Sequence, residues 1–502
     1  MPVDCKPPCR PHRPNRTCRL AAGLLAAGLL CAAGGCALIH ENGVPSAEVP
    51  PEQIRLADDI RLARDGWPQA RWWTHYDDPQ LAALIERALA EAPGMEVARR
   101  RVAQAKTEVE LVKSGTGLQA VAIGAIDREH VSAHGFLGPF ALNEPALGLD
   151  GPWYTEGIVG IGASLDIDLW GLQRAQVEAS IGLSNARLAE AYAVELELST
   201  DVAQLYYGIQ TYYQLIGLLE QAREVAAFSV QTHQARAALG LESRTLTEEA
   251  QAQLLTVERQ LVAARGTGRQ LRESLRALIG AGPDDMPEIR PVALPQISTG
   301  VPDSLSYELL ARRPDLQALR WVVQASFSRI DAAKAAFYPR FDIRAFFGFN
   351  ALHLSDLFMR ASQQINLIPG LTLPIFDGGR LNANLGGART ASNTLIAQYN
   401  QAVLNAVRDV AITGTRLQAL DDEAQLQRRK VQAVSFVRDS AEARYQRGLG
   451  SRYLAMEARQ PLIAEQIAQL TVDGQKISQE IALAKALGGG YRADPPVELK
   501  PR

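Results

Sequence analysis

Two stretches of the chain carry nearly the same sequence. ARAALGLESRTLTEEAQAQL (residues 235–254) and ARYQRGLGSRYLAMEARQPL (residues 443–462) agree at ten of twenty positions without a gap, 208 residues apart. The same offset aligns Gly171 with Gly379, and Gly280 with Gly488. Because this period is too long for a solenoid, the chain is predicted to contain two copies of one structural plan.

Each copy has the same predicted order of elements. A helix is followed by two alternating apolar runs that suit β-strands, then by a very long helix, a glycine-bearing break and a returning helix. The first helices are expected at 79–113 and 304–336, the strands at 118–126, 158–170, 341–349 and 365–376, the long helices at 171–238 and 379–447, and the returning helices at 246–279 and 454–487.

The returning helices have the apolar spacing of a coiled coil. In the first, Leu246, Ala250, Leu254 and Val257 begin a series with steps of four and three residues. At about 1.5 Å per residue, each long helix would span roughly 100 Å, which no compact domain requires. Such rods bridge a distance or line a tube. Four strands cannot close around a pore, and an open sheet edge is not viable in lipid, so membrane strands here would require several copies of the chain.

The N-terminus has the features of an export signal. Basic residues in 1–19 precede the short apolar run LAAGLLAAGLLCAAGGC, which ends at Cys36. This combination indicates a cleaved signal peptide rather than a spanning helix. The residues AAGGC resemble the bacterial lipoprotein signal, which implies that residues 1–35 are removed and that Cys36 carries lipid such as palmitate. An ordinary secretory signal is the alternative.

Composition and the repeat divide the residues beyond the signal into four segments. Residues 36–70, with three prolines in VPSAEVPPEQ, are predicted to be an extended lead. The first copy is placed at 71–290, the second at 291–490 and a C-terminal tail at 491–502. No cysteine follows Cys36, so the mature chain needs no disulfide, and a net charge of -3 gives no reason to expect nucleic acid as a partner.

Catalytic and metal-binding motifs do not emerge from the sequence. A phosphate loop ending in GKS or GKT, HExxH and GxSxG are missing, so the chain is predicted not to be an enzyme. Glu129, His130 and His134 have ligand-like helical spacing, but their surroundings favour an external loop, so no metal is expected. No cofactor is predicted apart from the covalent lipid.

Several longer motifs carry a family resemblance over roughly residues 70–490. They are DIDLWGLQRAQVEAS (166–180), RPDL (313–316), LPIFDGGRLNANL (373–385) and the repeated stretches. With them the chain resembles the TolC-like outer-membrane factors, and more narrowly the NodT-like lipoprotein branch of RND-type tripartite efflux systems. The resemblance implies a mainly α fold of long coiled-coil hairpins that form an α-barrel. Four strands per chain would complete a 12-stranded membrane β-barrel in a homotrimer.

The resemblance also implies a function. It is that of a trimeric outer-membrane channel in a multidrug efflux system, a passive duct with its helical tunnel in the periplasm. The expected partners are a periplasmic membrane-fusion adaptor, an inner-membrane pump reached through it, and outer-membrane lipid. Ala37, after the lipidated cysteine, favours the outer membrane. The alternatives are the exit duct of a type I-like protein secretion system and a lipid-anchored periplasmic coiled-coil scaffold without a pore.

The repeated stretches would then lie at the tips of two helical hairpins. Three chains would present a six-fold-like ring of tips to the adaptor. The expected docking residues form Gly-Leu-x-Ser-Arg in each copy: Gly240, Leu241, Ser243 and Arg244, and Gly448, Leu449, Ser451 and Arg452. On the residues alone, the two glycines are helix-ending turn residues.

Acidic residues just past the tips match the family's ring at the periplasmic gate. Glu249 and Glu457 occupy these positions, and a solvated helix face is the alternative. Three copies of either carboxylate around one axis would raise their pKa values or attract cations.

The family's closed-state lock is changed in this sequence. Tyr445 matches a tyrosine that ties the closed state, but Leu246 stands where its acidic partner is expected, and Leu454 replaces an acid in the second copy. We hypothesise that Arg244 or Arg452 with Glu248 forms the lock instead.

Other residues have structural interpretations. Asp166, Asp168 and Asp377 are expected to cap helices at strand-to-helix junctions. Pro461 is expected to kink the last helix or mark its true start. Trp72, Trp73 and Tyr76 are expected to pack in a core.

Overall fold

The computed structural model describes residues 46–47, 67–135, 151–296 and 312–492. Cys36, the signal peptide, most of the lead and most of the tail lie outside the described residues. Two compact units are formed: a strand unit, within 108–180 and 324–393, and a helix unit, which contains 67–107, 181–296, 312–323 and 394–492. Each unit takes segments from both predicted copies, so this spatial division differs from the sequence division, which stays a prediction.

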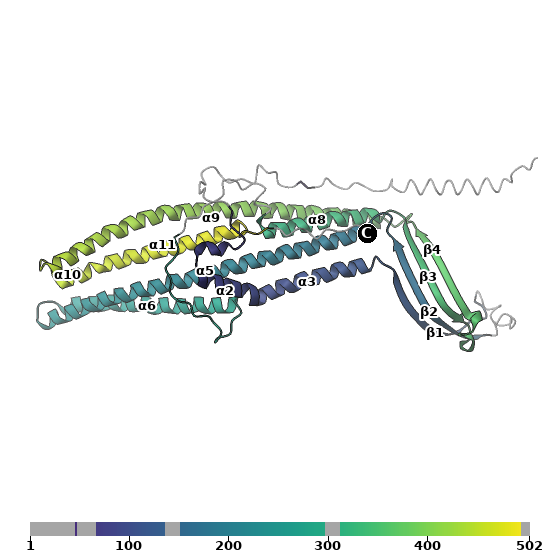
Figure 1. The fold of residues 1–502 in the computed structure, drawn as a ribbon, viewed down its shortest axis with the longest axis horizontal. Coiled ribbons are helices and arrows are strands. Elements are labelled where there is room, and N and C mark those ends of the chain that lie inside the picture. The colour runs from purple at the N-terminus through teal and green to yellow at the C-terminus, as the bar shows by residue number, and fades with distance from the viewer. Residues whose placement is uncertain (1–45, 48–66, 136–150, 297–311, 493–502) are drawn as a thin grey trace, which may run out of the picture. The chain divides into compact units, whose positions relative to one another are not determined.

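The strand unit contains one antiparallel sheet. Its strands are β1 (Gln119–His130), β2 (Trp153–Ile167), β3 (Arg340–Ala351) and β4 (Gln363–Thr372), paired in the order β1-β2-β3-β4 (Figure 1). All four predicted strands are present. β1 and β2 extend further toward their connecting loop than the apolar runs suggested, because Asp127–His130 pairs with Trp153–Glu156. The short 3-10 helices η5 (Leu354–Asp356) and η6 (Arg360–Ser362) connect β3 to β4.

Three aspartates were predicted to cap helices, and two of them do so, at the helices that follow the sheet. Asp168 accepts a hydrogen bond from the backbone N–H of Arg174 at 2.8 Å, in the first turn of α5 (Leu172–Ala238). Asp377 accepts from the N–H of Leu381 at 2.8 Å, at the start of α9 (Arg380–Gln446). This backbone hydrogen bond is the largest cause that lowers the pKa of the Asp377 carboxyl below its ordinary value.

Asp166 does not cap a helix, so that prediction is wrong. It is still within β2, where its side chain forms an ion pair with Arg340 (Oδ2 to Nη2, 3.7 Å). Nearby, Trp170 donates from Nε1 to the carbonyl oxygen of Pro339 at 2.9 Å and stacks on Tyr338 at a centroid distance of 4.9 Å. The junction is therefore held by side chains that connect the ends of β2 and β3.

The long helices agree closely with the sequence pattern, and two predicted helices are divided. The returning helix α6 spans Arg244–Leu278. The predicted helix 79–113 is two helices, α2 (Pro79–Glu91) and α3 (Pro93–Ser114). They are divided because a proline disfavours helical geometry at the residue that precedes it. The last helix is divided into α10 (Arg452–Glu457) and α11 (Arg459–Ala486). Pro461 lies in the first turn of α11, which confirms that it marks a helix start.

Each long helix in the helix unit lies beside its returning helix (Figure 1). Glu220 of α5 pairs with Arg265 of α6 at 2.7 Å, and Lys430 of α9 pairs with Glu465 of α11 at 2.9 Å. The predicted seam is partly buried in α6, where Leu261 is 3% exposed. Two helical hairpins therefore form, α5–α6 and α9–α10–α11.

An N-terminal segment packs into the largest apolar core of the described residues. The 3-10 helix η3 (Trp72–Tyr76) and α2 pack against both hairpins, and Trp72 donates from Nε1 to Ser199 Oγ at 3.2 Å. The predicted packing of the aromatic cluster is confirmed. The core includes Leu81, Ile85, Val202, Tyr206, Leu275, Ile279, Ile477 and Ile481.

Replacing Asp78 with alanine is expected to lower the free energy of unfolding by about 2–3 kcal/mol, as the lost helix cap and the unpaired buried hydroxyl combine. The Asp78 carboxylate accepts from the N–H groups of Gln80 and Leu81 at 2.9 and 3.2 Å, and from the buried Tyr206 hydroxyl at 2.7 Å. The apparent midpoint of thermal unfolding measures the loss. Asp78→Asn keeps an acceptor and should lose less than half as much; equal losses would contradict this account.

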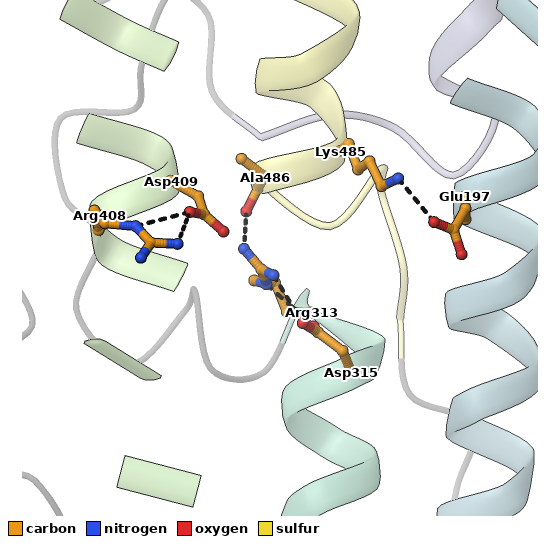
Figure 2. A network of polar contacts seen from close by, with 7 residues as sticks. All are labelled: Glu197, Arg313, Asp315, Arg408, Asp409, Lys485 and Ala486. Atoms are coloured by element: carbon orange, nitrogen blue, oxygen red, sulfur yellow. Dashed lines mark hydrogen bonds and ion pairs between the residues drawn. The ribbon is translucent and has the colours of Figure 1, made fainter. Parts of the chain in front are cut away.

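The α8 helix (Pro314–Ala335) starts at the RPDL motif, and the structure explains the motif's first and last residues. Arg313 forms a forked ion pair with Asp315 (Nη2 to Oδ2, 2.7 Å) and donates from Nη1 to the carbonyl oxygen of Ala486 at 3.2 Å (Figure 2). Leu316 is 1% exposed in a core with α9 and α11. In the same view, Lys485 reaches Glu197 of α5 at 3.3 Å. The motif thus fixes the end of α11 to the start of α8.

Candidate functional site: the hairpin tips and the sheet face

The two hairpin tips have the same backbone. The helix ends at a glycine with positive φ in each case, 69° at Gly240 and 72° at Gly448. The next N–H bonds back to the helix: Leu241 N to the Arg236 carbonyl at 2.9 Å, and Leu449 N to the Arg444 carbonyl at 2.8 Å. Each tip therefore has the two-bond geometry of a Schellman motif. The repeated sequence at 235–254 and 443–462 encodes one turn twice.

The predicted serines start the returning helices. Ser243 Oγ accepts from the N–H of Thr245 at 3.2 Å, and Ser451 Oγ accepts from the N–H of Leu454 at 3.3 Å. The glycines and serines of the docking motif thus have structural roles in the turn. The leucines do not: Leu241 is 67% exposed and Leu449 is 76% exposed. Their role in docking stays a prediction.

The predicted gate residues are only partly brought together. Arg244 pairs with Glu248 (Nε to Oε1, 3.2 Å), as hypothesised, and both side chains are exposed. Arg452 does not pair with Glu248 but lies over the ring of Phe228, 5.1 Å from its centroid. Whether the Arg244–Glu248 pair locks a closed channel stays a hypothesis.

The other gate candidates lie on the surface of the chain. Glu249 is exposed, and Tyr445 is 39% exposed. Glu457 is exposed and accepts a hydrogen bond from the hydroxyl of Tyr453 at 2.8 Å.

A polar cluster at the tips was missed by the sequence analysis. Glu242, in the first tip, is held by Arg236 Nε at 2.7 Å and by His233 Nδ1 at 2.7 Å. The second imidazole nitrogen of His233 lies 3.1 Å from the hydroxyl of Tyr453 in α10. We call His233, Arg236, Glu242, Tyr453 and Glu457 the tip cluster. It joins the two hairpins within one chain.

The repeat itself contained a signal for this cluster. At an offset of 208 residues, Ala441 corresponds to His233 and Gly450 to Glu242. Polar groups appear in the first copy at positions where the second has none. Such departures from an otherwise matching repeat point to side chains with a role beyond the shared turn.

Burial affects the hydroxyl at the centre of the cluster. Tyr453 lies beside Phe228 of α5 and Gln253 of α6 in a small pocket. Burial and the hydrogen bond to Glu457 raise the pKa of the Tyr453 hydroxyl, burial being the larger cause. Tyr453 therefore remains a proton donor throughout the physiological range.

The sheet has one apolar face that crosses all four strands. Ala122 pairs with Ile161, Ile161 with Phe347, and Phe347 with Ile365. Ile161, Phe347 and Ile365 are 56%, 53% and 69% exposed. Neighbouring positions on the strands alternate to a more polar face, with Ser164 paired to Arg344. This alternation is typical of strands that face lipid on one side.

The side chains of the described residues do not support metal binding. Within that part of the chain, no three His, Cys, Asp or Glu side chains gather in a way that could hold a metal ion. Glu129 and His130 end strand β1 rather than lying on a helix, and the His130 ring packs against Trp153 at 4.9 Å. No described helix has an apolar stretch long enough to cross a membrane.

Comparison with known proteins identifies the family. The family model for outer membrane efflux proteins matches residues 84–281 and 305–489. The multidrug resistance outer membrane protein MdtP of Escherichia coli K12 is 56% identical over 466 residues, which cover 93% of this chain and 96% of the relative. These two similarities place the chain in a family of outer membrane channels.

Solved structures share the fold. The outer membrane protein VceC of Vibrio cholerae is 29% identical with a TM-score of 0.73, covering 84% of this chain and all of VceC. CusC, described as forming a transmembrane channel, is 25% identical with a TM-score of 0.74, covering 90% of this chain and all of CusC. The predicted fold class, long helical hairpins with four strands, is confirmed.

The chain belongs to the outer membrane efflux protein family, whose members are transport channels. Membership was predicted from the junction motifs, RPDL and the repeated tips, and the prediction is confirmed.

Proposed function

We propose that three copies of this chain form a lipid-anchored duct through the outer membrane for a tripartite multidrug efflux system. The observation that supports it most is the sheet, which has an apolar face across all four strands and edges at β1 and β4 within the strand unit. A sheet with open edges is not viable in lipid, and additional copies would supply the missing strands. With four strands per chain, three copies would give about twelve.

The tips support a passive role that depends on partners. Two tips with one backbone geometry, each exposing a leucine, would let three chains present six similar docking points to a periplasmic adaptor. The inner-membrane pump would act through that adaptor. In this proposal the chain carries out no catalysis and binds no cofactor apart from lipid on Cys36.

Efflux is favoured over the two alternatives. MdtP is named a multidrug resistance protein, which favours small-molecule export over protein secretion. A periplasmic scaffold without a pore would give no reason for Ile161, Phe347 and Ile365 to form an exposed apolar band.

Native mass spectrometry of membrane-extracted protein in mild detergent tests this proposal. We expect the mass spectrum to show trimers of chains that begin at a lipidated Cys36. In planar bilayers, these trimers should conduct ions. Cys36→Ser is the matched control and should prevent lipidation and the normal processing. A monomer or dimer would contradict the proposal, because the strands could not close.

A further inference from the structure

The tip cluster connects the two hairpins through a continuous series of polar contacts. His233 reaches from α5 to Glu242 in the first tip at 2.7 Å and to the Tyr453 hydroxyl of α10 at 3.1 Å. Tyr453 in turn reaches Glu457 at 2.8 Å. The side chains of His233 and Glu242 are only 14% and 13% exposed, so these contacts are shielded from water. Movement of α10 away from α5 would break the contact between His233 and Tyr453.

The number of protons decides whether all three contacts can be hydrogen bonds at once. His233 to Glu242, His233 to Tyr453 and Tyr453 to Glu457 each require one proton. Ionised carboxylates supply none, and the Tyr453 hydroxyl supplies one. Neutral imidazole has one N–H and imidazolium has two. The complete series therefore forms only when His233 is protonated.

The charged groups near His233 come from α5, the first tip and α10. Glu242 faces it from the loop between the hairpin's helices, and Glu457 lies beyond Tyr453 on α10. Arg236, on the same helix as His233, forms an ion pair with Glu242 at 2.7 Å. Arg452 of α10 lies over an aromatic ring instead. The side chains that α6 places beside Tyr453 in the pocket are neutral, namely Ala250 and Gln253.

We propose that His233 is a proton-dependent latch between the two hairpins, which holds the tips together when protonated and releases one hydrogen bond when neutral. The inference rests on the proposed channel function and adds a regulator of its periplasmic end. Acid conditions favour the closed arrangement, because only a protonated imidazole donates from both ring nitrogens. The additional hydrogen bond is made when the imidazole carries its second proton and is absent when the imidazole is neutral.

The latch also accounts for the altered lock at the tips. Leu246 stands where an acid is expected to receive Tyr445. In this chain a different tyrosine, Tyr453, is tied by a histidine from the other hairpin. The carboxylate of Glu457 acts as the terminal acceptor of this series, so its position at the tip is explained without a metal or a cation.

Single-channel conductance at about pH 5.5 and about pH 8 tests the latch, since histidine titrates between these values. The open fraction of the full-length protein should rise about tenfold at the higher pH, as expected for loss of one charge-assisted hydrogen bond. His233→Gln places one donor nitrogen and one acceptor oxygen where neutral imidazole has one donor and one acceptor nitrogen, and should stay at the high-pH open fraction at both values. His75→Gln, which removes a histidine 3.9 Å from Glu480 and away from the tips, should behave as the unmodified protein.

A second readout does not depend on conduction. Spin labels at Leu241→Cys and Leu449→Cys report the distance between the two tips within the extracted protein. The distances should lengthen at the higher pH, and Tyr453→Phe should give the longer distances at both values. If no protein conducts while the distances still respond to pH, the channel proposal fails and the latch stands. If His233→Gln keeps the full pH response in either readout, the latch is wrong.

Discussion

Gly348→Val is expected to abolish assembly of the protein in the outer membrane. A Cβ at Gly348 would lie 2.3 Å from the carbonyl oxygen of Val159 and 2.6 Å from Cα of Gly160 on the neighbouring strand. It would also lie 2.8 Å from the ring of Phe346, which covers both glycines. Because two of these atoms belong to the backbone of β2, they cannot rotate away. Strands β2 and β3 would have to separate at the middle of the sheet.

Gly124→Val provides the matched control, as no atom lies within 4 Å of a Cβ added there. Gly124 pairs with Val159 on the side of the sheet that includes Ala122, where an extra apolar side chain is compatible with lipid. The measurement is the amount of heat-resistant oligomer in outer-membrane fractions. Gly124→Val should retain most of it and Gly348→Val almost none. Similar amounts from both variants would contradict the packing described for β2 and β3.

The sequence predicted the helices well because their apolar spacing is regular over many turns. Bounds of α5, α6 and α9 agree with it within two residues. The division at Pro93 was readable, since proline both restricts the preceding residue and starts helices, but the continuous apolar pattern concealed it. The ends of β1 and β2 were missed because Asp127–His130 pairs through its backbone, and backbone pairing leaves no hydrophobic signal.

Side-chain partners were harder to predict than backbone turns. Gly240 and Gly448 end helices because glycine adopts positive φ readily, and this local preference can be predicted from the sequence. Asp166 was expected to cap a helix, yet its partner Arg340 comes from a strand far along the chain. His233 and Tyr453 are likewise separated by 220 residues. No periodicity in one sequence encodes such pairs. The mismatch between the two copies at His233 was a signal for the tip cluster, but the sequence analysis did not use it.

Leu241→Glu combined with Leu449→Glu is expected to abolish drug resistance in cells that depend on this protein. These leucines follow the tip glycines and are 67% and 76% exposed, whereas a residue at this position often packs back on its helix. An exposed leucine held by a rigid turn is suited to insert into an apolar recess of a partner. Glutamate there would leave a charge buried against apolar surface, so docking should fail at all six tips of the proposed trimer.

The double variant should lose docking but keep its fold and assembly. Both tip turns are made by backbone N–H groups and by Ser243 and Ser451, so the proposed trimer should keep its heat resistance and its conductance. Thr245→Glu adds one glutamate, as a single leucine variant does, to an exposed site close by without removing a leucine, and should keep at least half of the resistance. Either single leucine variant should fall between the two, since three tips remain intact. Full resistance in the double variant, with normal protein levels, would show that the leucines do not carry docking and would leave Arg244, Arg452 and the exposed helix faces near the tips to do so.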